Sequence, residues 1–412
     1  MKDLNLNNHK TTYNDLLMIF LLFSSIFLQR LAFPLVNSQI AIALPILLMV
    51  TILYLFNNRF NISLIRVVIF TLFTVVILFL TFFHKLISYN SIFYLIILYL
   101  PFLIDMNYKI HSKLNYMLKL QTMIMITAII GILQFIFQLT GLGFFDPLTL
   151  LPENFLQQGY LTTYSISYGS DIMKSNGAFY LEPSLFSQFL AISIVIELIL
   201  FKRWIRIGIL AVALLFTFSG TGLMLLAFFL IPIIFTLKPK QTILILLLGF
   251  SVGFIFFTSE YGANTLVRTQ EYKSSTSSFS IRFINPFNAV VDSENSKIIF
   301  GHGAGSSDST IYNYPTNFTV IPKLWYEYGF VPMILFLFFI CNFLIKNKNK
   351  LLSFSILFMY LFLSGSLLQP QTIIFIFIMG NILEIDKNYL LTKGSKKDGF
   401  KMKKTFSSID YY

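Results

Sequence analysis

Long apolar runs separated by short polar segments dominate the 412-residue chain. A run of roughly 17 to 25 apolar residues can cross a bilayer as a helix. The pattern predicts an all-α, polytopic integral membrane protein forming a single multi-span domain, residues 1–412. Twelve runs fit, near residues 15–34, 38–56, 62–83, 86–104, 114–139, 178–201, 204–219, 221–237, 241–258, 324–345, 351–368 and 371–385. Several are short and Pro101 interrupts the fourth, so eleven spans are an alternative.

Composition supports a membrane protein. Hydrophobic residues make up 56% and charged residues only 12% of the chain, whereas soluble domains carry about 25% charge. The single cysteine, Cys341, excludes an internal disulfide and a cysteine-rich metal site. The polar N-terminal segment lacks a small-residue cleavage site before the first run, so we expect that run to be retained.

The positive charge indicates the orientation of the spans. With a cytoplasmic N-terminus, 22 of the 30 Lys and Arg residues fall in inner segments, as the positive-inside rule requires. Both termini are therefore predicted to be cytoplasmic, with residues 386–412 forming a basic tail near anionic headgroups. Because the net charge of +12 is explained as an orientation signal, no nucleic-acid partner is expected.

Two long polar loops, about 140–177 and about 259–323, both fall on the predicted outer side. The inner loops are too short to house an active site. Nucleotide sugars and ATP are absent outside the cell, so an enzyme there needs an activated substrate such as a lipid-linked phosphate ester. The second loop offers cations that can hold phosphate oxygens: Arg268, Lys273, Arg282 and Lys297.

Within the second loop, "FGHGAGSSD" at 300–308 is a glycine-punctuated turn. Gly301 and Gly303 would allow close backbone approach to a ligand, but the segment lacks the GK[ST] of a nucleotide-binding loop. His302 is either a general base or phosphate partner, or a loop histidine without chemistry. Asp308 is another candidate to accept a proton.

Glu182 and Pro183 stand inside the apolar segment "KSNGAFYLEPSLFSQFLA". Proline is tolerated in the first helical turn, and the residue before it avoids helical geometry. The helix is therefore predicted to start at Pro183, with Glu182 near its N-cap at the outer boundary and "GAFYL" as an extended or re-entrant lead-in. Glu182 either takes part in chemistry, as a base or by orienting an acceptor, or it caps the helix and pairs with Lys174.

These motifs resemble a known family. Residues 174–191 resemble the R-x-x-G-F-F-x-E-P-S-x-x-x-x-F-L-A signature of Wzy-type bacterial polysaccharide polymerases. "FSGTGLMLL" follows, and then "SFSIR", "IIFGHGAGSS" and "LWYEYGFVPMILF", which are similar to elements shared with O-antigen ligases. The resemblance covers about 174–340. Lys174 replaces a common Arg and loses its planar fork. Asn317 lies near the place where the ligases have a histidine before the helix at about 324, which favours a polymerase.

The resemblance implies a GT-C-like glycosyltransferase that needs neither metal nor cofactor. It would transfer a growing glycan from undecaprenyl pyrophosphate to a sugar hydroxyl of a new lipid-linked repeat unit, building O-antigen or capsule at the outer face of the bacterial inner membrane. Implied partners are that lipid-linked oligosaccharide, membrane lipids, a Wzz-type chain-length regulator and a flippase. Such chemistry needs cations for the leaving pyrophosphate and a base for the hydroxyl proton.

The site residues follow from this resemblance. Arg282, in the matching S-x-x-R context, is expected to clamp the pyrophosphate, or else to pair with Asp292 or Glu294. Arg30, at the outer end of the first span, either contacts lipid phosphate or snorkels to the interface. Glu182, Arg282 and His302 are the catalytic candidates. The remaining candidates would bind pyrophosphate or sugar: Arg268, Lys174, Arg30, Gly301, Gly303, Asp308 and Glu327.

Two alternatives stay open. An O-antigen ligase would use nearly the same donor and transfer the glycan to lipid A-core. A flippase or secondary transporter of lipid-linked sugars would show internal repeats and ionisable residues near the bilayer midplane. The chain has no convincing repeat, and its charges lie at helix ends and in outer loops, so an outer-face enzyme is favoured.

Overall fold

A computed structural model describes residues 13–35, 39–57, 61–84, 88–166, 169–235, 279–309, 314–363 and 367–383, with a few isolated residues between them. The described chain is mostly helical, as the apolar pattern predicts. One feature was not predicted, a short antiparallel hairpin of β1 (Ala32–Pro34) and β2 (Gln39–Ala41) in which Phe33 pairs with Ile40. It joins the first two helices.

The longer helices follow the predicted apolar runs. They are α1 (Tyr13–Phe27), α2 (Ala43–Asn57), α3 (Leu64–Thr81), α4 (Tyr89–Tyr99), α5 (Ile110–Leu139), α6 (Pro183–Ile196), α7 (Trp204–Phe216), α8 (Gly220–Ile234), α15 (Phe330–Ile345), α16 (Lys350–Phe358) and α17 (Pro370–Ile382). Each predicted run within the described ranges overlaps at least one helix, and of the run at 241–258 only isolated residues are described. Short 3-10 helices at Leu100–Leu103, Pro147–Leu150 and Glu153–Phe155, and π-helical turns at Glu197–Phe201, Ser280–Ile284 and Met359–Leu363, complete this set.

Among the residues that the structure describes, three helices are long and apolar enough to cross a membrane. They are α3, α5, and α6 together with its π-helical end, Pro183–Phe201. Within this last span 78% of the residues are buried in the protein, against 33% for α3. The helix that begins at Pro183 is therefore central, whereas α3 is peripheral and presents apolar side chains outward.

The predicted run at 324–345 is wrong as one continuous helix. The chain forms α14 (Val320–Tyr328), turns at Gly329, and only then begins α15. Gly329 has a φ of +86°, and a Cβ there would lie 2.2 Å from the carbonyl oxygen of Ile299. A left-handed residue in contact with another backbone stops the helix, because only glycine fits both conditions.

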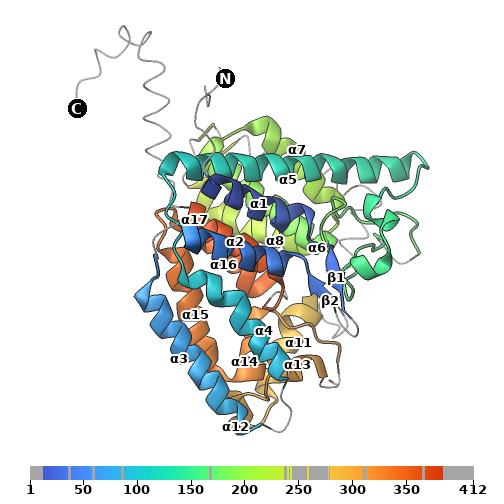
Figure 1. The fold of residues 1–412 in the computed structure, drawn as a ribbon. Coiled ribbons are helices and arrows are strands. Elements are labelled where there is room, and N and C mark those ends of the chain that lie inside the picture. The colour runs from blue at the N-terminus through green and yellow to red at the C-terminus, as the bar shows by residue number, and fades with distance from the viewer. Residues whose placement is uncertain are drawn as a thin grey trace, which may run out of the picture.

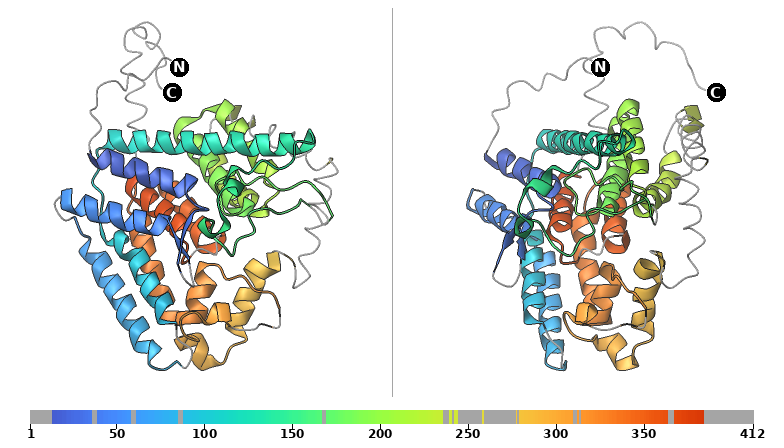
Figure 2. Two further views of the ribbon diagram at one scale, coloured as in Figure 1. Left: turned by 45° about the vertical axis from the view of Figure 1, so that its right-hand side comes forward. Right: turned by 90° about the vertical axis from the view of Figure 1, so that its right-hand side faces the viewer.

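The second long loop is also more ordered than its polar composition suggests. From residue 279 onward it contains α11 (Asn285–Val291), α12 (Asn295–Phe300), α13 (Ser306–Ser309) and α14, while residues 259–276 lie outside the described ranges. Figures 1 and 2 show two groups of helices. In one, α1, α2 and α5 lie side by side, and in the other α3, α4 and α15 lie at a large angle to the first group. The hairpin and α11–α14 gather near the ends of these groups.

Candidate functional site

The structure brings two of the predicted catalytic residues together. A guanidinium nitrogen of Arg282 lies 3.5 Å from Oε2 of Glu182, and the two side chains are 27% and 24% exposed. They are a hundred positions apart in the sequence and come from different elements, the N-terminus of α6 and the π-helical turn before α11. Arg282 therefore pairs with Glu182 rather than with the expected loop carboxylates, Asp292 or Glu294.

The start of α6 leaves the Glu182 carboxylate available for contacts across the site. The helix begins at Pro183, as predicted, and Glu182 is its N-cap residue in an extended conformation with φ −144° and ψ 153°. Its side chain makes no capping hydrogen bond. Instead Oε2 accepts a hydrogen bond of 2.8 Å from the Ser184 hydroxyl. Helix capping is thus not the role of this carboxylate, and no described ion pair joins it to Lys174.

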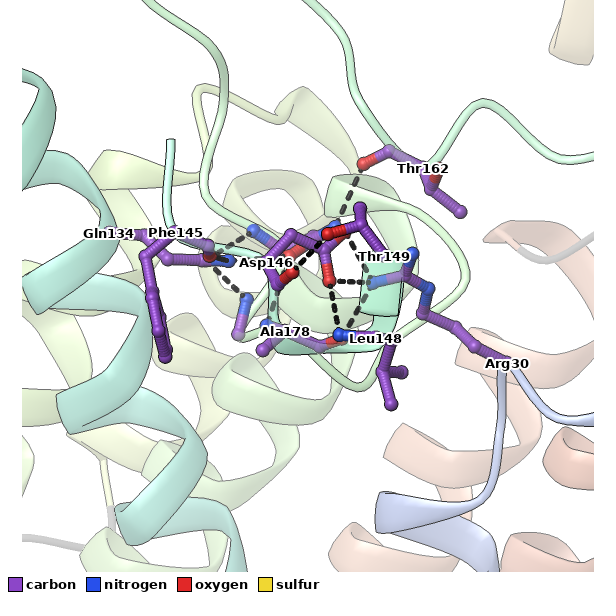
Figure 3. A network of polar contacts seen from close by, with 10 residues as sticks. Arg30, Gln134, Phe145, Asp146, Leu148, Thr149, Thr162 and Ala178 are labelled. Atoms are coloured by element: carbon purple, nitrogen blue, oxygen red, sulfur yellow. Dashed lines mark hydrogen bonds and ion pairs between the residues drawn. The ribbon is translucent and has the colours of Figure 1, made fainter. Parts of the chain in front are cut away.

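The segment before Glu182 is held by a buried arginine (Figure 3). One guanidinium nitrogen of Arg30 donates to both carboxylate oxygens of Asp146 and to the carbonyl oxygen of Ala178, each at 2.8 Å. Arg30 and Asp146 side chains are each only 4% exposed. Ala178 needs such support, because its φ of +65° is unfavourable for a residue with a Cβ. In this structure Arg30 positions the lead-in to Glu182, whereas the sequence suggested either a contact with lipid phosphate or a position at the membrane interface.

Buried amides complete this network (Figure 3). Gln134, on α5, donates to Oδ1 of Asn176 at 3.0 Å and to the carbonyl of Phe145 at 2.9 Å. Its own oxygen accepts from the backbone N–H of Gly177 at 3.0 Å. Asn176 in turn donates to the carbonyl of Thr162 at 2.8 Å. The "SNGA" part of the family-like signature therefore fixes the path of the chain into α6, and its side chains are turned inward.

The segment resembling "FSGTG" packs directly against α6. A Cβ on Gly222 would lie 2.5 Å from the carbonyl oxygen of Ser187, so α8 approaches α6 backbone to backbone. The Ser187 hydroxyl lies 3.1 Å from the amide nitrogen of Gly222, and the Thr221 hydroxyl donates to the carbonyl of Ser184 at 3.2 Å. Two separate motifs thus meet beneath Glu182.

Tyr160, from the first long loop, is a neighbour that sequence reasoning missed. Burial raises its pKa to about 12, the charge of Glu182 acts in the same direction, and a hydrogen bond with Gln369 opposes both. Gln369 is the N-cap residue of α17. The candidate site therefore combines a carboxylate, a guanidinium, a phenol and an amide from four parts of the chain. No signal around "QQGY" distinguishes Tyr160 from other loop tyrosines.

The glycine turn approaches its own chain rather than an open space. A Cβ on Gly301 would lie 2.5 Å from the carbonyl oxygen of Glu327, and Gly303 donates its N–H to the same carbonyl at 2.9 Å. The left-handed φ values of 83° and 102° at these glycines allow the turn to pack against the backbone at the end of α14. Their observed contacts are structural.

His302 is integrated into the same packing. Its ring stacks on Tyr326 with centroids 4.0 Å apart, and its two nitrogens lie 3.2 Å from the Tyr326 carbonyl and 3.3 Å from the Ser293 hydroxyl. The carbonyl can only accept, so Nδ1 carries a proton in this contact. Burial lowers the pKa of His302, which favours the neutral ring.

Glu327 and Asp308 form a second polar group. Lys323 binds Asp308 at 2.9 Å and lies 3.7 Å from Glu327, whose carboxylate accepts from Ser307 at 2.5 Å. Glu327 is fully buried, whereas the Asp308 side chain is 72% exposed. Burial raises the pKa of Glu327, although Lys323 and Ser307 oppose the shift.

The remaining candidates are not part of the Glu182–Arg282 pair. The Lys174 ammonium lies 4.6 Å from the ring centroid of Tyr164, and Arg268 lies outside the described residues. Within the described ranges no three His, Cys, Asp or Glu side chains are grouped to hold a metal ion. Comparison with family models, with curated proteins and with solved structures finds no match.

Proposed function

We propose that the chain is a polymerase of undecaprenyl-pyrophosphate-linked oligosaccharide repeat units, acting at the outer face of the inner membrane. The observation that supports this most is the pairing of Glu182 with Arg282 at 3.5 Å. Each residue belongs to a different motif of the resemblance, and a glycosyl transfer from a pyrophosphate needs one cation and one base in reach of the same substrate.

The proposed step transfers the donor glycan from the pyrophosphate to the acceptor hydroxyl. The acceptor hydroxyl oxygen forms a bond to the anomeric carbon of the donor glycan while the bond from that carbon to the pyrophosphate oxygen breaks. Arg282 stabilises the negative charge on the leaving pyrophosphate, for which its planar donors are suited. Glu182 accepts the hydroxyl proton. Ser184 donates a hydrogen bond to the Glu182 carboxylate, and Tyr160 is hydrogen-bonded to Gln369.

The topology required is the predicted one of about twelve spans with both termini in the cytoplasm, which places α11–α14 outside. A Wzz-type chain-length regulator and a flippase that delivers the repeat units are the protein partners expected of such an enzyme. Support for an outer site comes from the distribution of Lys and Arg and from the gathering of the two long loops around Glu182.

A deletion strain of the source bacterium tests the proposal. We expect surface lipopolysaccharide or capsule precursor bearing a single repeat unit and no ladder on a gel. Complete loss of attached repeats would indicate a ligase, and accumulation of the lipid-linked unit on the cytoplasmic side would indicate a flippase. Either outcome would replace the polymerase assignment.

Point variants test the site in the complemented strain. Glu182→Gln and Arg282→Ala should abolish the ladder at normal protein level. Lys297→Gln, on an outer lysine that is 47% exposed and paired only with Glu294 among the described residues, is the matched control and should leave the ladder unchanged. An unchanged ladder in either site variant removes that residue from the mechanism.

A further inference from the structure

The first long outer loop has an apolar exposed surface. Within residues 140–166, Leu150 is 88% and Leu142 is 75% exposed. The large apolar or aromatic side chains exposed there are Leu142, Phe145, Leu150, Leu151, Phe155, Leu161 and Tyr164. The segment has two charged residues, of which Asp146 is buried against Arg30 and Glu153 is exposed. Many exposed apolar side chains with so little charge mark contact with a membrane or with another protein.

The loop has a defined conformation that holds these side chains outward. It contains the two short 3-10 helices Pro147–Leu150 and Glu153–Phe155, and Leu156 forms a bridge with Leu31 before the hairpin. Gln39, on β2, donates to the carbonyl oxygens of Asn154 and Leu156 at 3.2 Å and 3.1 Å. Figure 1 shows the loop turning back from the end of α5 toward the hairpin. Its polar contacts are thus made with the protein, while the apolar side chains remain exposed.

This surface continues a stripe on α5. The exposed apolar side chains in the second half of that helix are Ile126, Ile129, Leu133, Ile136 and Leu139. Their spacing of three or four residues places them on one face of the helix, and Leu142 follows three positions later. Because α5 is long and apolar enough to cross a membrane, its outward apolar face is a lipid-facing one. The loop therefore extends a surface that already meets lipid.

The length of α5 gives the depth at which the loop begins. Lys119 is the last charged residue of the helix, and the twenty residues 120–139 that follow are uncharged. At 1.5 Å per residue they rise about 30 Å, which is the thickness of the hydrocarbon core. With Lys119 at the inner boundary, Leu139 reaches the outer boundary. Lipid-exposed irregular backbone does not occur within the hydrocarbon, so the loop backbone belongs at the level of the headgroups.

We propose that residues 142–161 form an interfacial segment that lies on the outer leaflet, with its backbone among the lipid headgroups and its exposed apolar side chains in the acyl region. Apolar side chains of interfacial helices contact lipid in this way. The partner is the lipid of the membrane that α5 crosses. The inference depends on that crossing and is independent of the proposed glycosyl transfer.

An interfacial position of this loop bears on access to the candidate site. Tyr160 belongs to the interfacial segment, is hydrogen-bonded to Gln369, and lies near enough to Glu182 to feel its charge. Glu182 would therefore lie close to the level of the headgroups. The pyrophosphate of a lipid-linked donor occupies the same level, so such a donor could reach Glu182 and Arg282 while its polyprenyl chain stays in the leaflet.

Spin labels on the full-length protein test the proposal. Cys341 is the only cysteine, so Cys341→Ala provides the background for three single-cysteine variants: Leu142→Cys, Leu150→Cys and Leu161→Cys. Each labelled protein is placed in nanodiscs of phosphatidylethanolamine and phosphatidylglycerol. The collision rate of the nitroxide is measured with oxygen, which concentrates in the bilayer, and with a water-soluble nickel chelate. We expect collisions with oxygen to dominate at all three positions.

Two further positions calibrate the measurement. Val75, on the apolar helix α3, is 57% exposed, and a label at Val75→Cys should report lipid. The side chain of Glu294, on the second outer loop, is 74% exposed, and a label at Glu294→Cys should report water. Both residues have exposures comparable with those of the loop residues, so a difference between the labels reflects the surrounding phase.

Each other result overturns the proposal. Dominant collisions with the nickel chelate at the loop positions, as at Glu294, would show a solvated loop. Low collision rates with both reagents would show that a protein partner or a second copy covers the surface. Unmodified protein gives a second measurement if a variant fails to fold: a lipid with a photoactivated carbene on its acyl chain should label peptides from residues 140–166 as well as peptides from α3. Labelling of α3 alone would contradict the interfacial position.

Discussion

The contact between Glu182 and Arg282 predicts a measurable energetic coupling. We propose a double-mutant cycle with Glu182→Gln, Arg282→Gln and the combined variant. Both replacements retain polar side chains of similar length, so they remove the charges with little loss of packing. If the two charges interact, the combined variant should lose little more stability than either single variant.

The expected size of this coupling follows from the geometry. At 3.5 Å, two unit charges attract by about 4.7 kcal/mol at an effective dielectric constant of roughly 20, and by about 1.2 kcal/mol in water. Both side chains are about one-quarter exposed, and desolvation together with side-chain ordering offsets much of the attraction. We therefore expect a coupling free energy of about 1 to 2 kcal/mol, which decreases with added salt.

The assay is equilibrium unfolding of the purified variants in mixed micelles with increasing sodium dodecyl sulfate, followed by circular dichroism. The exposed pair of Lys297 and Glu294, at 3.6 Å, is a control cycle at nearly the same distance, and its coupling should stay below about 0.5 kcal/mol. Additive losses at Glu182 and Arg282 would refute the pairing, and with it the main support for the proposed site.

Three further predictions use the same unfolding assay. Gly329→Ala should destabilise by about 1 to 3 kcal/mol, because its Cβ would lie 2.2 Å from a backbone oxygen. Gly208→Ala, with open space around it, should be neutral or stabilising by up to ~1 kcal/mol. Arg30→Gln should cost about 3 to 5 kcal/mol, since it leaves Asp146 buried without its cation, and Arg30→Gln/Asp146→Asn should recover part of the loss. Burial lowers the pKa of His302 below the unfolded value of 6.5. Acidification from about pH 7.5 to about pH 5.5 should therefore destabilise the wild type more than His302→Gln, because the unfolded chain binds the proton more readily than the folded chain. No gain for the Arg30/Asp146 double variant, or equal acid sensitivity with and without His302, would contradict these assignments.

The features that the sequence predicted best are those that depend on local chemistry. The apolar runs gave the helices, because a run of that length has few other ways to satisfy its backbone in lipid. The start of α6 at Pro183 followed from the missing N–H of proline and the restriction it places on Glu182. Neither conclusion needed knowledge of any distant contact.

Sequence failed where a backbone contact between distant segments decides the structure. Gly329 interrupts an apolar run that could otherwise continue as helix, and the reason is its contact with the carbonyl of Ile299. The turn around Gly301 was expected to approach a ligand, yet it approaches α14. Arg30 was expected at the interface, but it pairs with Asp146, which lies 116 positions away. No local sequence pattern predicts this contact.

The pairing of Glu182 with Arg282 has a consequence for the proposed reaction. In the structure the base candidate and the cation neutralise each other, so neither is fully available. A bound pyrophosphate carries more negative charge than one carboxylate and offers bidentate oxygens, so it competes effectively for the guanidinium. Its binding would release Glu182 to accept a proton from the incoming hydroxyl. On the proposed function, proton acceptance is therefore coupled to the presence of the donor, and Arg282→Ala removes two things at once: the clamp for the pyrophosphate and the ion-pair partner that Glu182 has before the donor binds.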